Sequence, residues 1–551
     1  MQSSQIFNDS VHGHIKMHPL LVDIIDTPEF QRLRNIKQMG GIYYVFPGAS
    51  HNRFEHSLGV GHLAGELVRS LKAQQPQEVQ EAEKITSIDM FCVQIAGLCH
   101  DLGHGPFSHL FEEVLKELAE RMVSETGESE TTEALKNWKH EEQSGKMFEQ
   151  LIKNGIKEKM KNGHYKDEHN EGLEFQDKDF EFIHELIEGT RPSTDSLNRE
   201  RHERKSYLYE IVANKETGID VDKMDYFSRD CHHVGMKSNF SHERYVMFAR
   251  VCTNEKNETH ICTRDKEAIN MYELFHNRYL LHYNVCQHRV KVAIETMIVD
   301  ALLAAEGHFK LGDKTISEAV IDPKTYLKLT DDILREIMRS TDNSLKTARK
   351  IIRRIDKRKI YKFVGGKIFQ KKDVKHLDSA ENRKAVVKKW LELIQKGSTR
   401  PCKCKCKKWQ EWFKKKQISE SKFFVKLVRL NYGKDDKDPI KSLGFYRKNK
   451  PHKSVKLSRN EVSFILPTIF AEIKVMLFYK GNGKLPKNPP IREFWELVER
   501  DAVREDSSEE LSRDSSEESS DESSEDSSEE SSVESSEDSS EESSENSSDD
   551  E

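Results

Sequence analysis

Residues 95–109 read Ile-Ala-Gly-Leu-Cys-His-Asp-Leu-Gly-His-Gly-Pro-Phe-Ser-His. Their apolar beginning continues a run from Ile88 and predicts a buried helix that ends near Gly103. This helix would present His100 and Asp101 side by side at its polar end. An imidazole nitrogen and a carboxylate oxygen both suit Fe, Mn or Zn, and adjacent residues can share one ion where a helix runs into a loop. The stretch therefore predicts a metal site on a helical scaffold.

Two further stretches could complete the ligand set. His56 lies at the start of a predicted helix, and Asp222 lies in the acidic stretch 218–225. Either residue alone is more often an ordinary core or surface residue. Together with the His-Asp pair they form the pattern of an HD-type phosphohydrolase. In such a site the ion binds the scissile phosphate, neutralises developing charge and activates an oxygen nucleophile.

Three more histidines, His104, His109 and His140, are candidates for acid–base chemistry, because an imidazole near a phosphate ester can protonate a leaving oxygen or hold the attacking water. We favour His109 with Glu112, one helical turn further on, as an acid–base pair. For His140, a position on a surface helix is an equally good interpretation.

Phosphates also need cations, and Arg53 and Lys223 lie close in sequence to the predicted ligands. Asp222, Tyr226 and Asp230 follow a four-residue spacing and would share one helical face. That face could present a metal ligand, an aromatic ring and a ribose-binding carboxylate to one pocket. Core packing or an ordinary ion-pair stripe is the competing interpretation.

The charge of the chain is divided unevenly. Residues 501–551 are Ser, Glu and Asp repeats with 23 acidic residues and two arginines, a net charge of −21. They contain almost no apolar side chain, so we expect them to be disordered. Because the whole chain carries −7, the other 500 residues carry +14, which suits polyanionic ligands such as nucleotides or single-stranded nucleic acid.

The nine cysteines in 551 residues do not form a disulfide framework, which favours a reducing compartment. The N-terminus lacks the features of a signal peptide, and no run approaches the roughly 18 apolar residues of a membrane span. We expect a soluble intracellular protein of the nucleus or cytoplasm, with no membrane partner.

Apolar periodicity predicts a mainly α fold. A hairpin is predicted at 246–252 and 260–263, and a C-terminal lobe of mixed strands and helices includes strand signals at 423–428 and 463–467. A short extended piece is predicted at 43–47. The predicted helices cover residues 19–39, 56–71, 88–99, 110–121, 142–155, 178–188 and 268–306.

These motifs resemble the SAM-and-HD-domain deoxynucleoside triphosphate triphosphohydrolases of animals. The resemblance runs from about residue 7 to 375, and more weakly to 480. It is carried by His12-Gly-His, Ile24-Ile-Asp-Thr-Pro, the stretch 43–61, the stretch 99–109 and Asp220-Val-Asp-Lys. It implies an HD-domain catalytic core over 1–320, a regulatory and oligomerisation lobe over 321–500, and the acidic tail 501–551.

The resemblance implies cleavage of a dNTP to a deoxynucleoside and intact triphosphate, which controls dNTP pools and restricts viral DNA synthesis. The metal ligands would be His56, His100, Asp101 and Asp222, and the catalytic residues His104, His109, Glu112 and His140. Glu112 stands where the family has Asp. The implied substrate contacts are Gln38, Arg53, Lys223, Tyr226, Asp230, Arg278, His282 and Gln287.

The resemblance also implies activation by GTP and a dNTP, bound with Mg²⁺ between subunits of a homotetramer. A carboxylate at Asp26 suits the donor groups of guanine, and arginines suit phosphates. The GTP contacts would be Asp26, Gln31, Arg34 and Arg358. The contacts of the second nucleotide would be Asn8, Arg244, Arg264, Lys266 and His288.

Three departures from the family bear on function. The resemblance begins within ten residues of Met1, so we expect no SAM domain. Gln5 replaces a lysine of the activator site, and Cys286 replaces a tyrosine near the sugar. The alternatives are therefore an HD phosphohydrolase of altered nucleotide selectivity and a nucleic-acid-binding scaffold.

Overall fold

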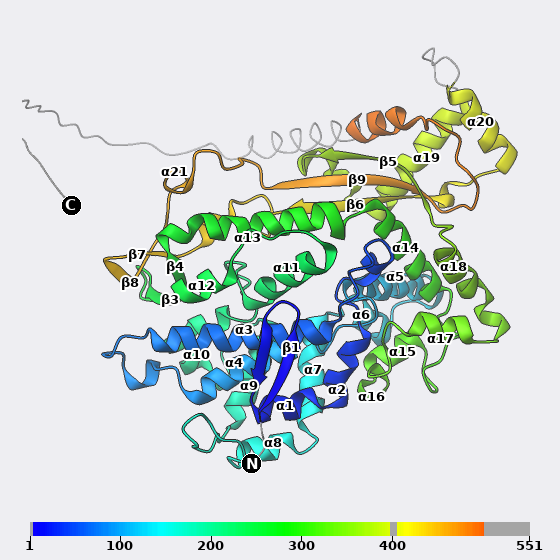
Figure 1. Cartoon of the computed structure of the whole chain (residues 1–551). Helices are drawn as coiled ribbons and strands as arrows, with labels where there is room; N and C mark the ends of the chain where they lie inside the picture. Colours follow the sequence, from blue (N-terminus) through cyan, green and yellow to red (C-terminus); the bar gives the residue numbers. More distant parts are fainter. Residues whose placement is uncertain (1–3, 397–404, 501–551) are drawn as a thin grey trace, which may run out of the picture.

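The computed structural model describes residues 4–396 and 405–500 (Figure 1). Helices dominate these ranges, accompanied by a hairpin, a small barrel and a three-stranded sheet. The predicted mainly α class, with a smaller sheet-containing part, is confirmed. The predicted disorder of residues 501–551 lies outside the described residues.

The helices follow in chain order. Up to residue 303 they are α1 (Pro19–Ile25), α2 (Pro28–Gln31), α3 (Arg53–Ala73), α4 (Ser87–Cys99), α5 (His109–Thr126), α6 (Glu130–Lys136), α7 (His140–Ile152), α8 (Ile156–Lys161), α9 (Asp177–Glu188), α10 (Arg199–Lys205), α11 (Val221–Val234), α12 (His242–Phe248), α13 (Ala268–Leu281) and α14 (Arg289–Leu303). Beyond it they are α15 (Ile316–Ile321), α16 (Pro323–Tyr326), α17 (Ile333–Arg339), α18 (Lys346–Asp356), α19 (Ala380–Lys396), α20 (Lys405–Lys416) and α21 (Arg459–Val462).

Helices α3 and α4 pack side by side in the main hydrophobic core and carry two predicted metal ligands. His56 lies in the first turn of α3, and His100 is the C-terminal cap of α4. A Cβ at Gly61 would lie 2.6 Å from Leu98 Cγ, so glycine is what lets the two helices approach this closely. The apolar packing of the helices thereby fixes where both imidazoles lie.

The single helix predicted over 19–39 is wrong. Thr27 accepts a hydrogen bond from Phe30 N, and Pro28 occupies the first helical position, so α2 starts anew after α1. A 3₁₀ turn, η1 (Arg32–Asn35), follows α2. The extended piece predicted at 43–47 is also wrong, because residues 40–44 form the 3₁₀ turn η2 (Gly40–Tyr44).

The helix predicted over 268–306 is divided into α13 and α14. A π-helical turn, η6 (His282–Cys286), separates them. Such turns widen a helix locally and are frequent at functional sites. This turn directs His282 and Cys286 toward the cavity described below.

The strands form three groups. β1 (Gln5–Asp9) and β2 (Gly13–Met17) form an antiparallel hairpin, with Gln5 opposite Met17. The barrel contains β3 (Arg250–Thr253), β4 (Thr259–Arg264), β7 (Phe445–Arg447) and β8 (Lys450–Val455). The predicted hairpin is confirmed as β3 and β4, although residues 246–248 belong to α12.

The three-stranded sheet has the order β5 (Lys362–Phe369), β9 (Ala471–Tyr479), β6 (Phe423–Asn431) and is antiparallel. Alternate residues of β9 face opposite sides, as a strand requires. Val475 and Leu477 pack with Trp390 of α19 in a second core, whereas Met476 and Phe478 join the main core. The sheet is therefore the layer between the helical body and α19 (Figure 1).

The strand predicted at 463–467 is wrong. These residues form a loop in which Phe464 is 81% and Ile465 is 93% exposed. The strand that pairs with the predicted β6 begins later, at Ala471. Apolar composition alone therefore misplaced the strand.

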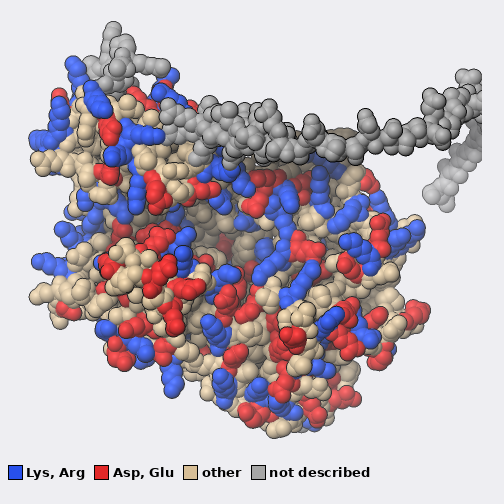
Figure 2. All heavy atoms as spheres, turned by 180° about the vertical axis from the view of Figure 1, so that it is seen from behind, with Lys and Arg blue, Asp and Glu red and all other residues tan. Residues whose placement is uncertain are grey.

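The surface carries both signs of charge. Figure 2 shows Lys and Arg interspersed with Asp and Glu over the face seen from behind. Among the residues that the structure describes, no helix is both long and apolar enough to cross a membrane.

Candidate active site

The four predicted metal ligands lie together. The Nε2 atom of His56 lies 3.1 Å from Asp222 Oδ1 and 3.3 Å from Asp101 Oδ2. The Nε2 atom of His100 lies 3.4 Å from Asp101 Oδ1 and 3.5 Å from Asp222 Oδ1. The ends of α3 and α4 and the first turn of α11 thus bring two imidazoles and two carboxylates to one point.

The arrangement fits a divalent metal. Both Nε2 atoms are buried, and neither forms a hydrogen bond within the described residues, although carboxylate oxygens are near. Ligands about 2.1 Å from one ion would be separated by about 3.0 to 3.4 Å from one another, close to the four distances above. Ligand atoms of His56, His100 and Asp101 lie within 4.8 Å of one another, and Asp222 Oδ1 lies beside both imidazoles.

The opposite ring nitrogens of both histidines are held by acceptors. His56 Nδ1 donates to Asp225 Oδ2 at 2.7 Å, and His100 Nδ1 donates to the carbonyl of Gly97 at 2.8 Å. These bonds put the proton on Nδ1 and leave the Nε2 lone pairs for a metal. Asp225 was not among the residues predicted from the sequence; its place one turn after Asp222 on α11 was the available signal.

The charges of the cluster also favour a cation. Burial opposes a charged imidazole, yet the carboxylates of Asp222 and Asp225 raise the pKa of His56 to about 10. Burial likewise opposes a charged Asp101, but Arg53 and the neighbouring histidines hold the pKa of that carboxyl well below its usual range. A dication at this point would compensate the same carboxylates that otherwise attract a proton to His56.

The three candidate acid–base histidines form a second group beside the first. The rings of His104 and His140 stack with centroids 4.0 Å apart, and that of His109 meets both edge-on. Glu112 Oε1 accepts from His140 Nδ1 at 2.8 Å and from His109 Nδ1 at 3.4 Å. Glu112 therefore contacts both histidines, with the shorter bond to His140.

A strained turn places His109. Phe107 and Ser108 have φ angles of 62° and 58°, a left-handed conformation uncommon for residues with a Cβ. Asp331 accepts from Phe107 N at 2.6 Å and from Lys37 N at 3.0 Å. The carboxylate of Asp331 thus holds two walls of the site together.

A cavity of about 570 Å³ connects the two groups. This volume is within the range of small-molecule sites. Cys286 contributes to its wall. The predicted residues that line it are Gln38, Arg53, His100, Asp101, His104, His109, His140, Asp222, Lys223, Tyr226, Asp230, Arg278, His282 and Gln287. His56 and Glu112 do not line the cavity themselves. His56 contacts the lining residue Asp222, and Glu112 accepts a hydrogen bond from the lining residue His140.

Several cationic and polar side chains of the cavity are already anchored. Arg53 donates to Asp101 at 2.6 Å, and Lys223 pairs with Asp220 at 2.7 Å. Arg278 donates to the carbonyl of Asn431 at 2.6 Å, which joins the cavity to the C-terminal part of the chain. These contacts fix where the positive charge lies.

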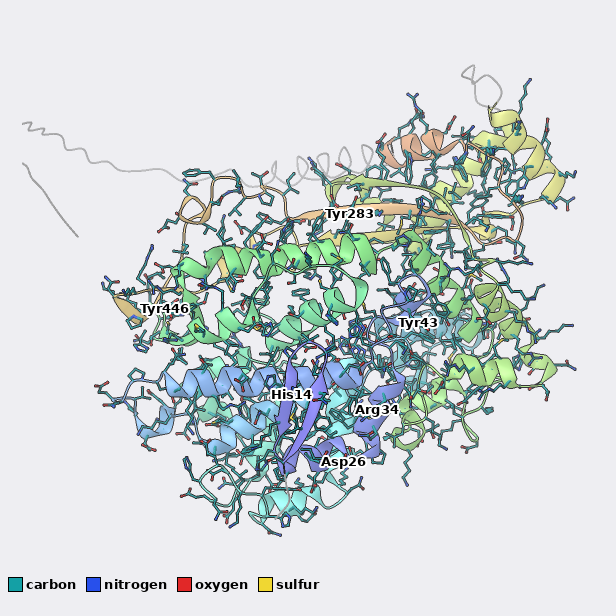
Figure 3. All side chains as sticks on the ribbon, viewed as in Figure 1. His14, Asp26, Arg34, Tyr43, Tyr283 and Tyr446 are labelled. Carbon is teal, nitrogen blue, oxygen red and sulfur yellow. The ribbon has the colours of Figure 1, made fainter. Side chains whose placement is uncertain are left out.

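The predicted activator residues do not meet in one place within the single chain. Gln31 accepts from Arg34 and donates to the carbonyl of Ile25, beside Asp26 (Figure 3). Arg358 donates to the carbonyl of Tyr44 at 2.8 Å. These residues lie at the surface, with Asp26, Arg34 and Arg358 exposed.

The residues predicted for the second nucleotide are also spread over the surface. Arg244 and Lys266 both lie over the ring of Phe248. His288 lies near Phe46, with ring centroids 6.0 Å apart. The remaining members are Asn8 on β1 and Arg264 at the end of β4.

Comparisons with known proteins cover the region of this site. The family model described as HD domain matches residues 53–230, which include all four predicted ligands. The chain is 44% identical to the human deoxynucleoside triphosphate triphosphohydrolase SAMHD1, over 87% of this chain and 71% of that protein. It is 44% identical to the Xenopus laevis protein of that name, over 87% and 72%. It is 36% identical to the Dictyostelium discoideum homologue, over 88% and 79%.

The helical fold and the His-Asp cluster define the chain as an HD-domain protein. Within that class, it belongs to the deoxynucleoside triphosphate triphosphohydrolase SAMHD1 family.

Proposed function

We propose that this protein hydrolyses deoxynucleoside triphosphates to the deoxynucleoside and intact triphosphate. The observation that carries the proposal is that His56, His100, Asp101 and Asp222 lie together beside a cavity that His104, His109 and His140 also line. Membership of the family supplies the substrate class. In a cell this activity would control dNTP pools and restrict viral DNA synthesis.

His56, His100, Asp101 and Asp222 would hold a divalent transition metal. Two imidazoles and two carboxylates suit Fe, Mn or Zn. When bound, the ion would neutralise charge on the α-phosphate and activate an oxygen nucleophile. Arg53, fixed by Asp101 and by Ser108 Oγ at 2.9 Å, would add positive charge at the same phosphate.

The leaving group needs a proton. Attack of a water oxygen on the α-phosphorus breaks the bond to the 5′ oxygen of the deoxynucleoside, and that oxygen must be protonated. His109, whose side chain is 70% exposed and borders the cavity, would supply this proton. Despite burial, the hydrogen bonds from His109 and His140 lower the pKa of Glu112, so its carboxylate would stabilise the imidazolium forms. His104 would complete the catalytic group.

The rest of the cavity would bind the nucleotide. Lys223 and Arg278 would contact phosphates, and Tyr226 and Asp230 the sugar. Burial, with Arg278 nearby, lowers the pKa of His282 to about 3, so this ring would bind as a neutral donor or acceptor. Gln38 and Gln287 are the further proposed contacts.

Cys286 supports a second candidate, an HD phosphohydrolase of altered sugar selectivity. Its side chain lines the cavity on the π-helical turn, and burial raises the pKa of its thiol to about 12. A neutral thiol is smaller than the phenol ring that the family has there, so room for a 2′-hydroxyl would increase. Comparing triphosphate release from each dNTP and each NTP tests this candidate.

Activation would come from GTP and a dNTP, each with Mg²⁺, bound between copies of this chain in a homotetramer. The exposed positions of Asp26, Arg34 and Arg358, together with those of Arg244 and Lys266, support such sites at the surface. Residues 321–500 would be the regulatory and oligomerisation lobe. Single-stranded nucleic acid is an additional partner that the basic body would accept.

The location of the enzyme would be the nucleus or the cytoplasm. Cys92 and Cys99 are free and buried, and burial raises the pKa of the Cys99 thiol above its ordinary value. Free thiols of this kind fit a reducing compartment.

The test is to incubate the full chain with each dNTP, with and without GTP and Mg²⁺, and to measure triphosphate release. The variant with His100→Ala and Asp101→Ala serves as the comparison. We expect release by the wild type and none by the variant. No release by the wild type under any nucleotide mixture would refute the activity, and undiminished release by the variant would refute the site.

A further inference from the structure

The N-terminal hairpin β1–β2 is built into the protein next to the proposed metal centre. Ile15 and Met17 of β2 are buried in the main core. The turn of the hairpin is closed by Asp9, whose Oδ1 accepts from Val11 N at 2.9 Å and from His12 N at 2.8 Å. Figure 1 shows the hairpin in dark blue at the front of the molecule, with its turn directed toward α3 and α11.

His12 reaches from this turn to the carboxylate that holds a metal ligand. Its Nε2 atom donates to Asp225 Oδ1 at 2.6 Å, while His56 Nδ1 donates to Asp225 Oδ2 at 2.7 Å. The side chain of His12 is 3% exposed, and those of Asp225 and His56 are fully buried. One carboxylate therefore connects a hairpin residue directly with a proposed ligand.

Arg229 makes a second connection. It donates to both oxygens of Asp225, at 2.8 and 2.9 Å, and to Asp9 Oδ2 at 2.8 Å. The hairpin is therefore attached to Asp225 through His12 on one side and through Asp9 and Arg229 on the other. These contacts are charge-assisted hydrogen bonds between buried side chains, where such bonds are strong.

The helix backbone leaves space for this network. A Cβ on Gly59 would lie 1.9 Å from Asp225 Oδ1 and 2.6 Å from Arg229 Nη2. Only a glycine at this position of α3 allows the carboxylate and the guanidinium to sit against the helix. The site is thus shaped around Asp225 from three elements.

We propose that His12 is a positioning residue of the metal centre: by holding Asp225 it fixes the orientation of His56, so the hairpin β1–β2 sets the affinity for the metal. Without His12, Arg229 and His56 still bond to Asp225, but the carboxylate loses its 2.6 Å bond at Oδ1 and with it one of the contacts that fix its orientation against His56. Outer partners of ligating histidines contribute about 10- to 100-fold in metal affinity. Any event that displaces the hairpin would weaken metal binding in the same way.

His14 provides a matched control. It lies on the same hairpin, two residues from His12, but its side chain is exposed (Figure 3). Replacing it removes an imidazole from β2 without touching Asp225. His12→Gln is the conservative variant, because the glutamine amide can place a donor near the position of Nε2.

The experiment measures Mn²⁺ binding to the metal-stripped full chain by calorimetry and by the Mn²⁺ electron paramagnetic resonance signal. We expect His12→Ala to weaken binding about 10- to 100-fold, His14→Ala to bind as the wild type does, and His12→Gln to recover part of the affinity. If His12→Ala does not fold, His12→Leu preserves more volume while removing the donor. Unchanged Mn²⁺ affinity in a folded His12→Ala or His12→Leu would overturn the inference.

The inference rests on the proposed metal centre, and His56→Ala separates the two. If His56→Ala weakens Mn²⁺ binding and His12→Ala does not, the centre stands and the positioning role is wrong. If His56→Ala also leaves Mn²⁺ binding unchanged, the centre itself is wrong and the role of His12 is overturned with it.

Discussion

The proposed metal centre, formed by His56, His100, Asp101 and Asp222, and the predicted activator residues are organised in opposite ways. Three helices of one chain place Asp222 Oδ1 3.1 Å from His56 Nε2 and 3.5 Å from His100 Nε2. Arg34 and Arg244, by contrast, lie at the exposed surface of separate elements and bond to local partners. A single chain therefore assembles the proposed catalytic centre, whereas the proposed activator sites would need a second copy of the chain to bring their residues together.

Removing a metal ligand tests the first half of the comparison and should have the largest effect. Asp222→Ala removes one carboxylate from the proposed metal centre, and we expect the metal content to fall. Triphosphate release should drop about 1000-fold or more, because the metal contributes several kcal/mol to stabilising the transition state. Asp177→Ala, in the first turn of α9, is the control. Triphosphate release near the wild-type rate by Asp222→Ala would show that the proposed metal centre is not catalytic.

Glu112→Gln tests whether the group of His104, His109 and His140 takes part in catalysis. The neutral amide cannot stabilise an imidazolium at His109 or His140, so we expect the turnover number to fall about 10- to 100-fold while metal content stays the same. Glu120→Gln, exposed on the same helix, should behave as the wild type. Equal turnover in the two variants would remove Glu112 from the mechanism.

Arg34→Ala tests the second half of the comparison. We expect the GTP concentration for half-maximal activation to rise about 10-fold, because one charge-assisted bond to a phosphate is lost, with no change in metal content. Arg69→Ala, another exposed arginine, is the control. A GTP response identical to the wild type would mean that Arg34 is only a solvated side chain over Phe54.

Asp331 lies between the two regions and gives the smallest effect. Its carboxylate binds the pocket wall, and its N–H donates to the carbonyl of Asn35. Burial raises the pKa of Asp331 to about 7, so the folded state keeps this proton to higher pH than the unfolded state. Protonated Asp331 therefore stabilises the folded state fully below about pH 4, and this stabilisation is lost as the pH rises through about 7.

The measurement compares melting temperatures of the wild type and Asp331→Asn at about pH 5 and about pH 8. The melting temperature of the wild type should fall more between the two pH values than that of Asp331→Asn, because asparagine does not titrate. The same change in both proteins would show that Asp331 does not titrate differently in the folded state.

The sequence predicted the position of His100 and Asp101 at a helix end better than it predicted the elements around them. His100 and Asp101 are adjacent, and the periodicity around them is strong, so their place at a helix end could be predicted. The 19–39 helix was mispredicted because Thr27 and Pro28 restart it, a local capping effect that competes with apolar spacing. The π-helical turn at 282–286 leaves no comparable mark in the sequence.

Tertiary partners were the other limit. Asp220, Asp222 and Asp225 lie on one short stretch, and spacing alone does not tell which of them faces the metal, which caps α11 and which holds His56. Glu112 was paired with His109 by its distance along the helix, whereas its shorter bond is to His140, 28 residues away. Contacts between separate elements depend on packing that the sequence does not display.

The most direct test of the account is to strip the metal from the full chain and measure triphosphate release from dNTPs before and after adding it back. We predict about one transition metal per chain in the native protein, loss of release on stripping, and recovery with Fe, Mn or Zn in the wild type but not in Asp222→Ala. Full triphosphate release by the metal-free protein would contradict the account.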